Sequence, residues 1–323
     1  MSPKIVTVVG ATGAQGKGVI AAFANNAAYH VRALTRNPSS PSGKALTSQG
    51  LEVVQADVND LDSLKAAFAG SHIIYGVTNF FEPFASLNSP EKAMEVEVQQ
   101  GINLALAAAS TPTLEHYIWS TLPDAKAVSG GKYLVPHFEG KIRIDNYIRN
   151  EQPALLAKTS FFWVTFYHSN LQFPMFTPYW IPTAQKYVQF ANYAADTPIT
   201  TIGDVSVNIS PFVKAVVEQP EKTKNGNVVL ASLEDHGAEE MLQIWAGAKG
   251  TKAQFVRVSG EAFREIWPLW GEEMGVMMEF WDEYKEKSWA VTVPGQKLVT
   301  AEGLGITRNM LQGLEEAYQG FEL

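Results

Sequence analysis

Short apolar runs alternate with longer amphipathic segments through the first half of the chain. The apolar runs predict strands at residues 5–9, 30–35, 51–55, 73–78, 117–120 and 155–158. The segments between them predict helices near residues 16–25, 61–68, 90–109 and 138–150, with Asp60 as the N-cap of the second. This alternation indicates an α/β fold with a doubly wound parallel sheet.

The second half of the chain has a different pattern. Aromatic residues crowd together from Phe161 to Trp180, and prolines 174, 178 and 182 break any long helix there. Residues 260–287 predict a pair of helices interrupted at Pro268 and Gly271. We therefore expect residues 1–160 to form a Rossmann domain and residues 161–323 to form mostly a smaller C-terminal α+β lobe for a substrate or partner. The two are interleaved, with later segments near residues 187–233 returning to the sheet.

The first strand runs directly into three glycines spaced G-x-x-G-x-x-G, in Gly10-Ala-Thr-Gly13-Ala-Gln-Gly16. Such a motif binds a dinucleotide when it forms the first strand-to-helix turn of a βαβ unit. Gly10 permits the turn, Gly13 lets the backbone approach a pyrophosphate, and Gly16 allows close packing of helix and strand. A Gly-rich turn without a ligand is the alternative.

The second strand predicts which dinucleotide binds. An NAD-binding unit places an acidic residue roughly 20 residues after the glycines, but no acidic residue lies between Gly16 and Glu52. Arg36 stands at the strand end instead, where a guanidinium suits a 2′-phosphate. The sequence therefore favours NADP(H) over NAD(H).

Composition narrows the function further. The net charge of −8 argues against a nucleic-acid partner. The chain has no apolar run of about 18 residues, which argues against a membrane span. The chain has no cysteine, and its six histidines are scattered along the sequence. We therefore expect no metal site. We expect a cytoplasmic protein.

Several motifs together resemble the NmrA-like family of atypical short-chain dehydrogenases/reductases. They are residues 10–16, Thr35-Arg36, residues 55–57, Thr78-Asn79-Phe80, residues 120–122 and His137-Phe-Glu-Gly-Lys141. Residues 159–170 look most like the fungal members. The resemblance implies an NAD(P)-binding Rossmann fold and NADP(H). The expected cofactor contacts are Gly10, Thr12, Gly13, Ala14, Gln15, Gly16, Arg36, Asp57, Val58, Thr78, Asn79, Phe80, Lys141 and Phe162.

The catalytic motif departs from that of ordinary short-chain dehydrogenases. These use Tyr-x-x-x-Lys, whereas the matching residues here are His137-x-x-x-Lys141. Lys141 is expected to anchor the nicotinamide ribose, and either Lys141 or His137 can act as the acid or base. Thr121, at the end of the fifth strand, is a candidate for orienting a substrate oxygen.

These observations lead to three functional hypotheses. The first is an NADPH-dependent oxidoreductase acting on a small apolar or aromatic carbonyl or conjugated compound. The second is a catalytically silent NADP(H)-sensing regulator that binds a protein such as a transcription factor. The third is an isomerase or dehydratase on the same scaffold. A homodimer is compatible with each of them.

Overall fold

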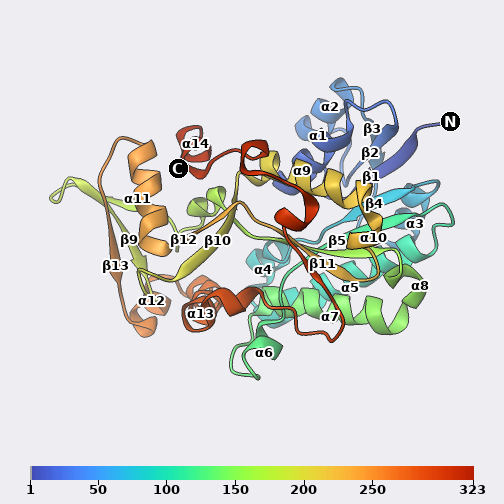
Figure 1. Cartoon of the computed structure of the whole chain (residues 1–323). Coiled ribbons are helices and arrows are strands. Elements are labelled where there is room, and N and C mark those ends of the chain that lie inside the picture. Colours follow the sequence, from blue (N-terminus) through green and yellow to red (C-terminus); the bar gives the residue numbers. More distant parts are fainter. Residues whose placement is uncertain (1) are drawn as a thin grey trace.

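Residues 2–323 are described by a computed structural model whose centre is an eight-stranded sheet (Figure 1). The strand order is β14-β11-β6-β5-β4-β1-β2-β3, and all neighbours pair in parallel. The strands are β1 (Lys4–Val8), β2 (Tyr29–Thr35), β3 (Glu52–Gln55), β4 (Ile73–Gly76), β5 (His116–Thr121), β6 (Thr159–Val164), β11 (Asn227–Ala231) and β14 (Leu298–Val299). The chain reverses direction across the sheet between β1 and β4, where α/β sheets bind ligands.

Helices cover both faces of this sheet. In Figure 1, α1 (Ala14–Phe23), α2 (Pro41–Ser48) and α9 (Val205–Glu218) lie above the strands, and the second set lies below them. The second set comprises α3 (Leu61–Phe68), α5 (Pro90–Ala109), α7 (Pro136–Glu151) and the short α8 (Pro153–Leu156). Helix α4 (Phe81–Leu87) follows β4, and α6 (Ala125–Val128) and α10 (Pro220–Thr223) are short connectors. Two buried apolar clusters separate the sheet from the two sets of helices.

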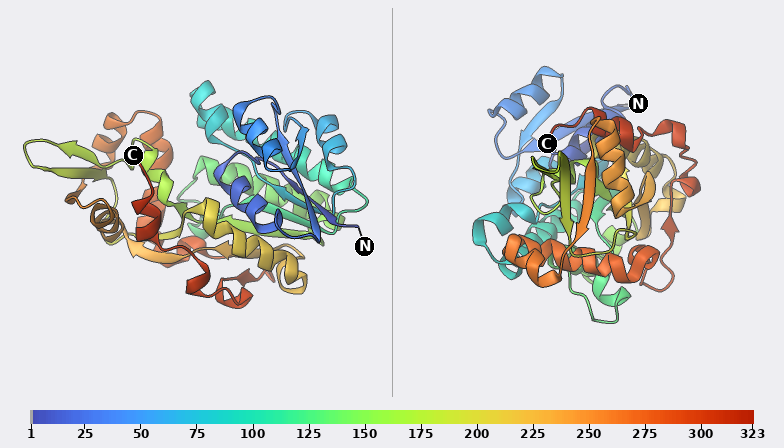
Figure 2. Two further views of the ribbon diagram at one scale, coloured as in Figure 1. Left: turned by 90° about the horizontal axis from the view of Figure 1, so that it is seen from above. Right: turned by 90° about the vertical axis from the view of Figure 1, so that its left-hand side faces the viewer.

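The C-terminal lobe carries two three-stranded sheets, and Figure 2 shows it beside the central sheet, away from the N-terminus. One sheet joins β7 (Phe166–Tyr167), β10 (Pro198–Gly203) and β12 (Glu234–Gly237), and the other joins β8 (Tyr179–Ile181), β9 (Lys186–Ala191) and β13 (Ala253–Arg257). Its helices are α11 (Ala238–Ala248), α12 (Gly260–Ile266), α13 (Trp270–Tyr284) and α14 (Leu314–Gln319). Four 3-10 turns occupy His168–Gln172, Lys285–Trp289, Glu302–Leu304 and Arg308–Met310.

The predicted fold class, a Rossmann fold with a doubly wound parallel sheet and a smaller α+β lobe, is confirmed. Most predicted strands lie within two residues of the observed ones, but the strand expected at residues 155–158 is wrong. Pro153 begins α8 there, because proline is well suited to the first turn of a helix. The true strand is β6, in which every residue is buried, so the first aromatic residues of this segment belong to the central sheet.

A domain boundary at residue 160 would fall inside β6. Segments from both halves of the chain contribute to the central sheet. Within residues 187–233, α9 packs against α1 and β11 pairs with β6, whereas β9 and β10 belong to the smaller sheets. The expected helical pair corresponds to α12 and α13, with Pro268 between them and Gly271 inside α13. Among the described residues, no helix is both long enough and apolar enough to cross a bilayer.

Candidate functional site

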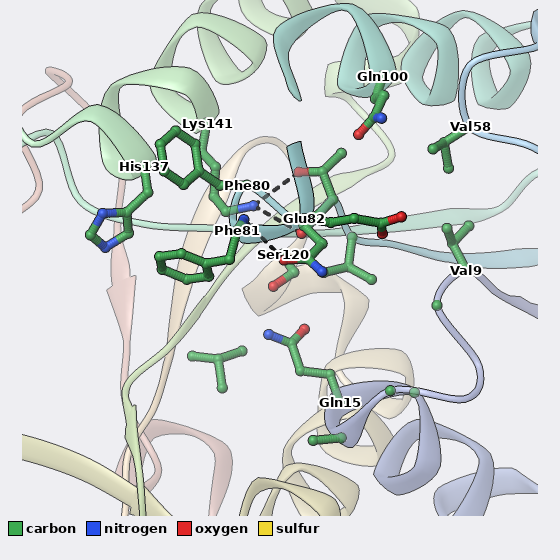
Figure 3. A pocket seen from close by; sticks show the side chains of 18 of the residues that line it. Val9, Gln15, Val58, Phe80, Phe81, Glu82, Gln100, Ser120, His137 and Lys141 are labelled. Atoms are coloured by element: carbon green, nitrogen blue, oxygen red, sulfur yellow. Dashed lines mark hydrogen bonds between the residues drawn. The ribbon is translucent and has the colours of Figure 1, made fainter. Parts of the chain in front are cut away.

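A cavity of about 1090 Å³ lies at the carboxyl ends of the parallel strands, between the central sheet and the C-terminal lobe. Figure 3 shows Val9, Val58 and Gln100 at one side of it and His137 at the other. The cavity brings together most of the residues predicted from the sequence: Gly10, Thr12, Gly13, Ala14, Gln15, Gly16, Arg36, Val58, Thr78, Asn79, Phe80, Thr121, His137 and Lys141.

The glycine turn lines one wall and fits a dinucleotide. Gly10 has a φ of +65°, and a Cβ on Gly16 would lie 2.2 Å from the Gly10 carbonyl oxygen, so neither position accommodates a side chain easily. Gly13 is the N-cap of α1 and supplies no side-chain cap. The first backbone N–H groups of α1 therefore line the cavity without a capping side chain, which is the arrangement that holds a pyrophosphate.

Gln15 connects this turn to Tyr75 and Tyr167 through hydrogen bonds. Its Oε1 accepts a hydrogen bond of 2.5 Å from the Tyr75 hydroxyl, and its Nε2 donates one of 2.5 Å to the Tyr167 hydroxyl. Burial raises the pKa of Tyr167 to about 12, so the phenol remains protonated at neutral pH. Gln15 thus links β4 of the central sheet to β7 of the C-terminal lobe across the cavity wall.

Arg36 lies at the cavity edge but is already paired. Its guanidinium donates to both carboxylate oxygens of Glu82 on α4, at 2.5 and 3.2 Å. The hydrogen bond to Glu82 raises the pKa of Arg36, and both side chains are more than half exposed. A 2′-phosphate would therefore meet an arginine that has a competing anion beside it.

Lys141 is buried and fully engaged. Its Nζ donates to the carbonyl oxygen of Thr78 at 3.4 Å, to the Thr78 hydroxyl at 3.0 Å and to Glu97 Oε1 at 3.0 Å. The side chain of Glu97 has no solvent-exposed surface. A Cβ on Gly140 would lie 2.8 Å from Glu97 Oε2, so the glycine in the His137–Lys141 motif makes room for this carboxylate.

Thr121 lines the cavity, and its hydroxyl donates to Asp145 Oδ2 at 3.0 Å. Trp119 donates to the other oxygen of Asp145. Burial raises the pKa of Asp145 to about 6, although the two hydrogen bonds and nearby positive charges lower it. The hydroxyl of Thr121 is therefore committed to a buried carboxyl group behind the cavity.

His137 pairs with a carboxylate from the other lobe. Its Nδ1 and its backbone N–H both contact Glu273 Oε1 on α13, the backbone at 3.2 Å. Both residues are buried. The rings of Phe80 and Phe81 lie 5.9 and 5.4 Å from the imidazole, centre to centre. Figure 3 shows these two side chains beside His137. His137 is thus the ionisable group at the apolar end of the cavity.

This end is built from aromatic and thioether side chains. Phe81 packs against Phe173 and stacks on Trp270, with ring centres 5.4 and 5.9 Å apart. The C-terminal lobe adds to the cavity wall Phe166, Phe173, Met274, Met277, Trp281 and Trp289. Such walls bury flat apolar molecules well, because aromatic rings and methionines adapt to their faces.

Two residues expected to contact the cofactor do not line the cavity. Phe162 points into the core, fully buried, with its ring 6.2 Å from that of Tyr75, and does not line the cavity. Asp57 also lies outside the lining, where its Oδ1 accepts from the backbone and side chain of Asn59. Asp60 caps α3, as predicted.

Three carboxylates of the site were missed from the sequence: Glu82, Glu97 and Glu273. Each meets its partner across at least 44 residues of chain, so no local spacing indicates the pairs. Glu97 and Glu273 are acidic residues on the buried faces of α5 and α13, which was the available signal for these two, whereas Glu82 is exposed. Within residues 2–323, no three His, Asp or Glu side chains gather as they would around a metal ion.

Comparison with known proteins identifies the family. A model of the NmrA-like family matches residues 2–304. The chain belongs to the NmrA-like family. It is 28% identical over 329 residues to the NmrA-like family domain-containing oxidoreductase hkm9 of Aspergillus hancockii, covering 95% of this chain and 92% of that relative.

Solved structures of known proteins share the fold. NmrA, a negative transcriptional regulator, in complex with NADP matches with a TM-score of 0.74 and 19% identity, covering 99% of this chain and 95% of that one. The NADPH-dependent quinone oxidoreductase QOR2 of Escherichia coli, complexed with NADPH, matches with a TM-score of 0.68 and 15% identity, covering 97% and 98%. Both likenesses support the Rossmann architecture described above.

Proposed function

We propose that this protein is an NADP(H)-dependent oxidoreductase that reduces a small apolar or aromatic carbonyl or conjugated compound. The observation that carries the proposal is the single cavity that joins the glycine turn to His137 and Lys141 and ends in aromatic walls. Its volume of about 1090 Å³ exceeds the roughly 300–1,000 Å³ of common ligand pockets, as a dinucleotide together with a substrate would require.

The roles follow from placement. The N-terminus of α1 holds the pyrophosphate and Arg36 binds the 2′-phosphate. Lys141, held by the Thr78 hydroxyl and Glu97, turns to the nicotinamide ribose the N–H that otherwise makes its longest hydrogen bond, 3.4 Å to the Thr78 carbonyl oxygen. The bound cofactor supplies hydride, and the aromatic end excludes water and holds the substrate. The relatives named as oxidoreductases and the NADPH complex of a structural neighbour support this assignment.

The test is a titration followed by an activity measurement. NADPH and NADH are titrated calorimetrically, and NADPH oxidation is then followed with quinones, enones and aryl ketones. We expect tighter binding of NADPH and turnover with at least one aromatic carbonyl. Failure of NADPH to bind contradicts the proposal outright.

A second candidate function is a regulator that binds NADP(H) without turnover. The replacement of the usual tyrosine by His137 favours it, as does the similarity of fold to NmrA, a negative transcriptional regulator. Tight NADPH binding, no turnover with the whole panel, and a nicotinamide face covered by Phe80 and Phe81 in a complex would together select this candidate.

A further inference from the structure

Three of the side chains that line the cavity are the proton donors expected from the sequence, and two of them already donate to other groups. An ammonium has three N–H donors, and those of Lys141 meet the two oxygens of Thr78 and one of Glu97. The Thr121 hydroxyl donates its single proton to Asp145. The Nζ of Lys141 is therefore held by Thr78 and Glu97, and the hydroxyl proton of Thr121 points at Asp145.

His137 is the third group, and one of its two ring nitrogens has no hydrogen-bond partner among residues 2–323. Nδ1 contacts Glu273 Oε1, whereas Nε2 makes no hydrogen bond with any residue in the described range 2–323. The ring lines the cavity between Phe80 and Phe81. When a carboxylate accepts from Nδ1–H, the exchangeable position of an imidazole is Nε2.

Glu273 is a buried carboxylate in the first turn of α13. One carboxylate oxygen meets both the ring and the backbone N–H of His137, at the second residue of α7, so it also caps that helix. Its own helix, α13, starts from Leu269, which adopts φ +68° and ψ −56°. A leucine in this conformation is strained, and such strain persists at sites where the surroundings require it. The N-terminal turns of α7 and α13 thus converge on one carboxylate.

We propose that His137 donates the proton in the reduction and that Glu273, from the C-terminal lobe, is the positioning residue that keeps Nδ1 protonated and Nε2 toward the substrate. This rests on the oxidoreductase function proposed above. It goes further by assigning the acid and by making the active site dependent on contact between the two lobes.

The step balances for a carbonyl substrate. The carbonyl carbon receives a hydride with its two electrons, the C=O π pair moves to oxygen, and that oxygen takes the proton from Nε2. The carbonyl is reduced to an alcohol, the dihydronicotinamide is oxidised, and neutral His137 with Nδ1–H against Glu273 regains its proton from water. Glu273 remains a hydrogen-bond acceptor throughout.

The first arm of the test is kinetic and uses NADPH with an aryl ketone of the panel. His137→Gln should lower kcat by roughly 10²–10⁴-fold, and Glu273→Gln by up to about 10⁴-fold, each with little change in the Kd for NADPH. Glu273→Asp should recover part of the loss. Glu272→Gln is the matched control, because Glu272 is the exposed neighbour on the same turn of α13.

The second arm needs no turnover. Nitrogen-15 imidazole NMR of the six histidines, with His137→Gln giving the assignment, should show His137 protonated at Nδ1 in the wild type. The signal should change in Glu273→Gln and stay constant in Glu272→Gln. A neutral ring protonated at Nε2 in the wild type would overturn the inference even if no substrate is found.

The two proposals fail in different ways. If NADPH does not bind, the oxidoreductase function falls, while the spectrum still reports whether Glu273 fixes the ring. If the wild type reduces ketones and Glu273→Gln does so equally fast, the function stands and the inference is wrong. If Glu273→Gln does not fold, Glu273→Asp and the wild-type spectrum decide the question.

Discussion

The pairing of Arg36 with Glu82 leads to a quantitative prediction for cofactor selectivity. Their salt bridge is exposed, with side chains 62% and 53% accessible, so it contributes about 0.2–1 kcal/mol. A charge-assisted contact between Arg36 and a 2′-phosphate is worth on the order of 1.5–3 kcal/mol. The phosphate therefore displaces Glu82 with a net gain, and the protein should prefer NADPH to NADH.

Two substitutions separate these contributions. Arg36→Glu should weaken NADPH binding by roughly 10- to 100-fold, since about 1.4 kcal/mol corresponds to a factor of ten. Glu82→Gln should tighten NADPH binding by about 1.5- to 5-fold, because it frees Arg36 and removes a negative charge beside the phosphate. Neither change should alter NADH binding strongly.

The assay is calorimetric titration of both cofactors into wild type and variants. Arg143→Glu is the control, because Arg143 forms an exposed pair with Glu139 on α7, outside the cavity lining. Equal affinity of the wild type for NADH and NADPH would refute the reasoning. So would an unchanged preference in Arg36→Glu.

Three further predictions concern the turn, the anchor and the pH dependence. Gly13→Val should abolish NADPH binding in calorimetry while circular dichroism stays native, and unchanged affinity would show that the glycine serves only the turn. Lys141→Met should weaken NADPH binding and lower kcat together, whereas a loss confined to kcat would assign Lys141 to proton transfer alone. The pKa of Asp145, raised from 3.8 to about 6, makes its stabilising contribution complete below pH 3.8 and lost as the pH rises through 6. Asp145→Asn should therefore gain about 2–3 kcal/mol relative to wild type between pH 4 and pH 8 in urea unfolding, and a constant difference would contradict this.

The glycine turn and the first strands could be predicted because their signals are local. The apolar run before Gly10 and the helix that begins at Ala14 lie within about one βα unit, and their geometry follows from steric rules. The strand prediction at residues 155–158 was wrong because a short apolar run is compatible with either a strand or a helix. Pro153, just before it, favours the start of a helix.

The pairing of the cavity residues with Glu82, Glu97 and Glu273 could not be predicted from the sequence, because it depends on tertiary contacts. His137 and Glu273 are 136 residues apart, and the helix that carries Glu273 is placed by packing of the C-terminal lobe. The same is true of Glu82, which stands on a helix that no periodicity predicted. The sequence identified most of the residues that line the cavity, whereas the residues that pair with them became visible only in the folded chain.

The most direct test of the oxidoreductase account is the structure of the protein in complex with NADP⁺. The account predicts the pyrophosphate on the N-terminus of α1, the 2′-phosphate on Arg36 in place of Glu82, and an open apolar space beside nicotinamide C4 that is bordered by His137. A nicotinamide packed face-on against Phe80 or Phe81, with no room for a substrate and His137 out of reach, would contradict it.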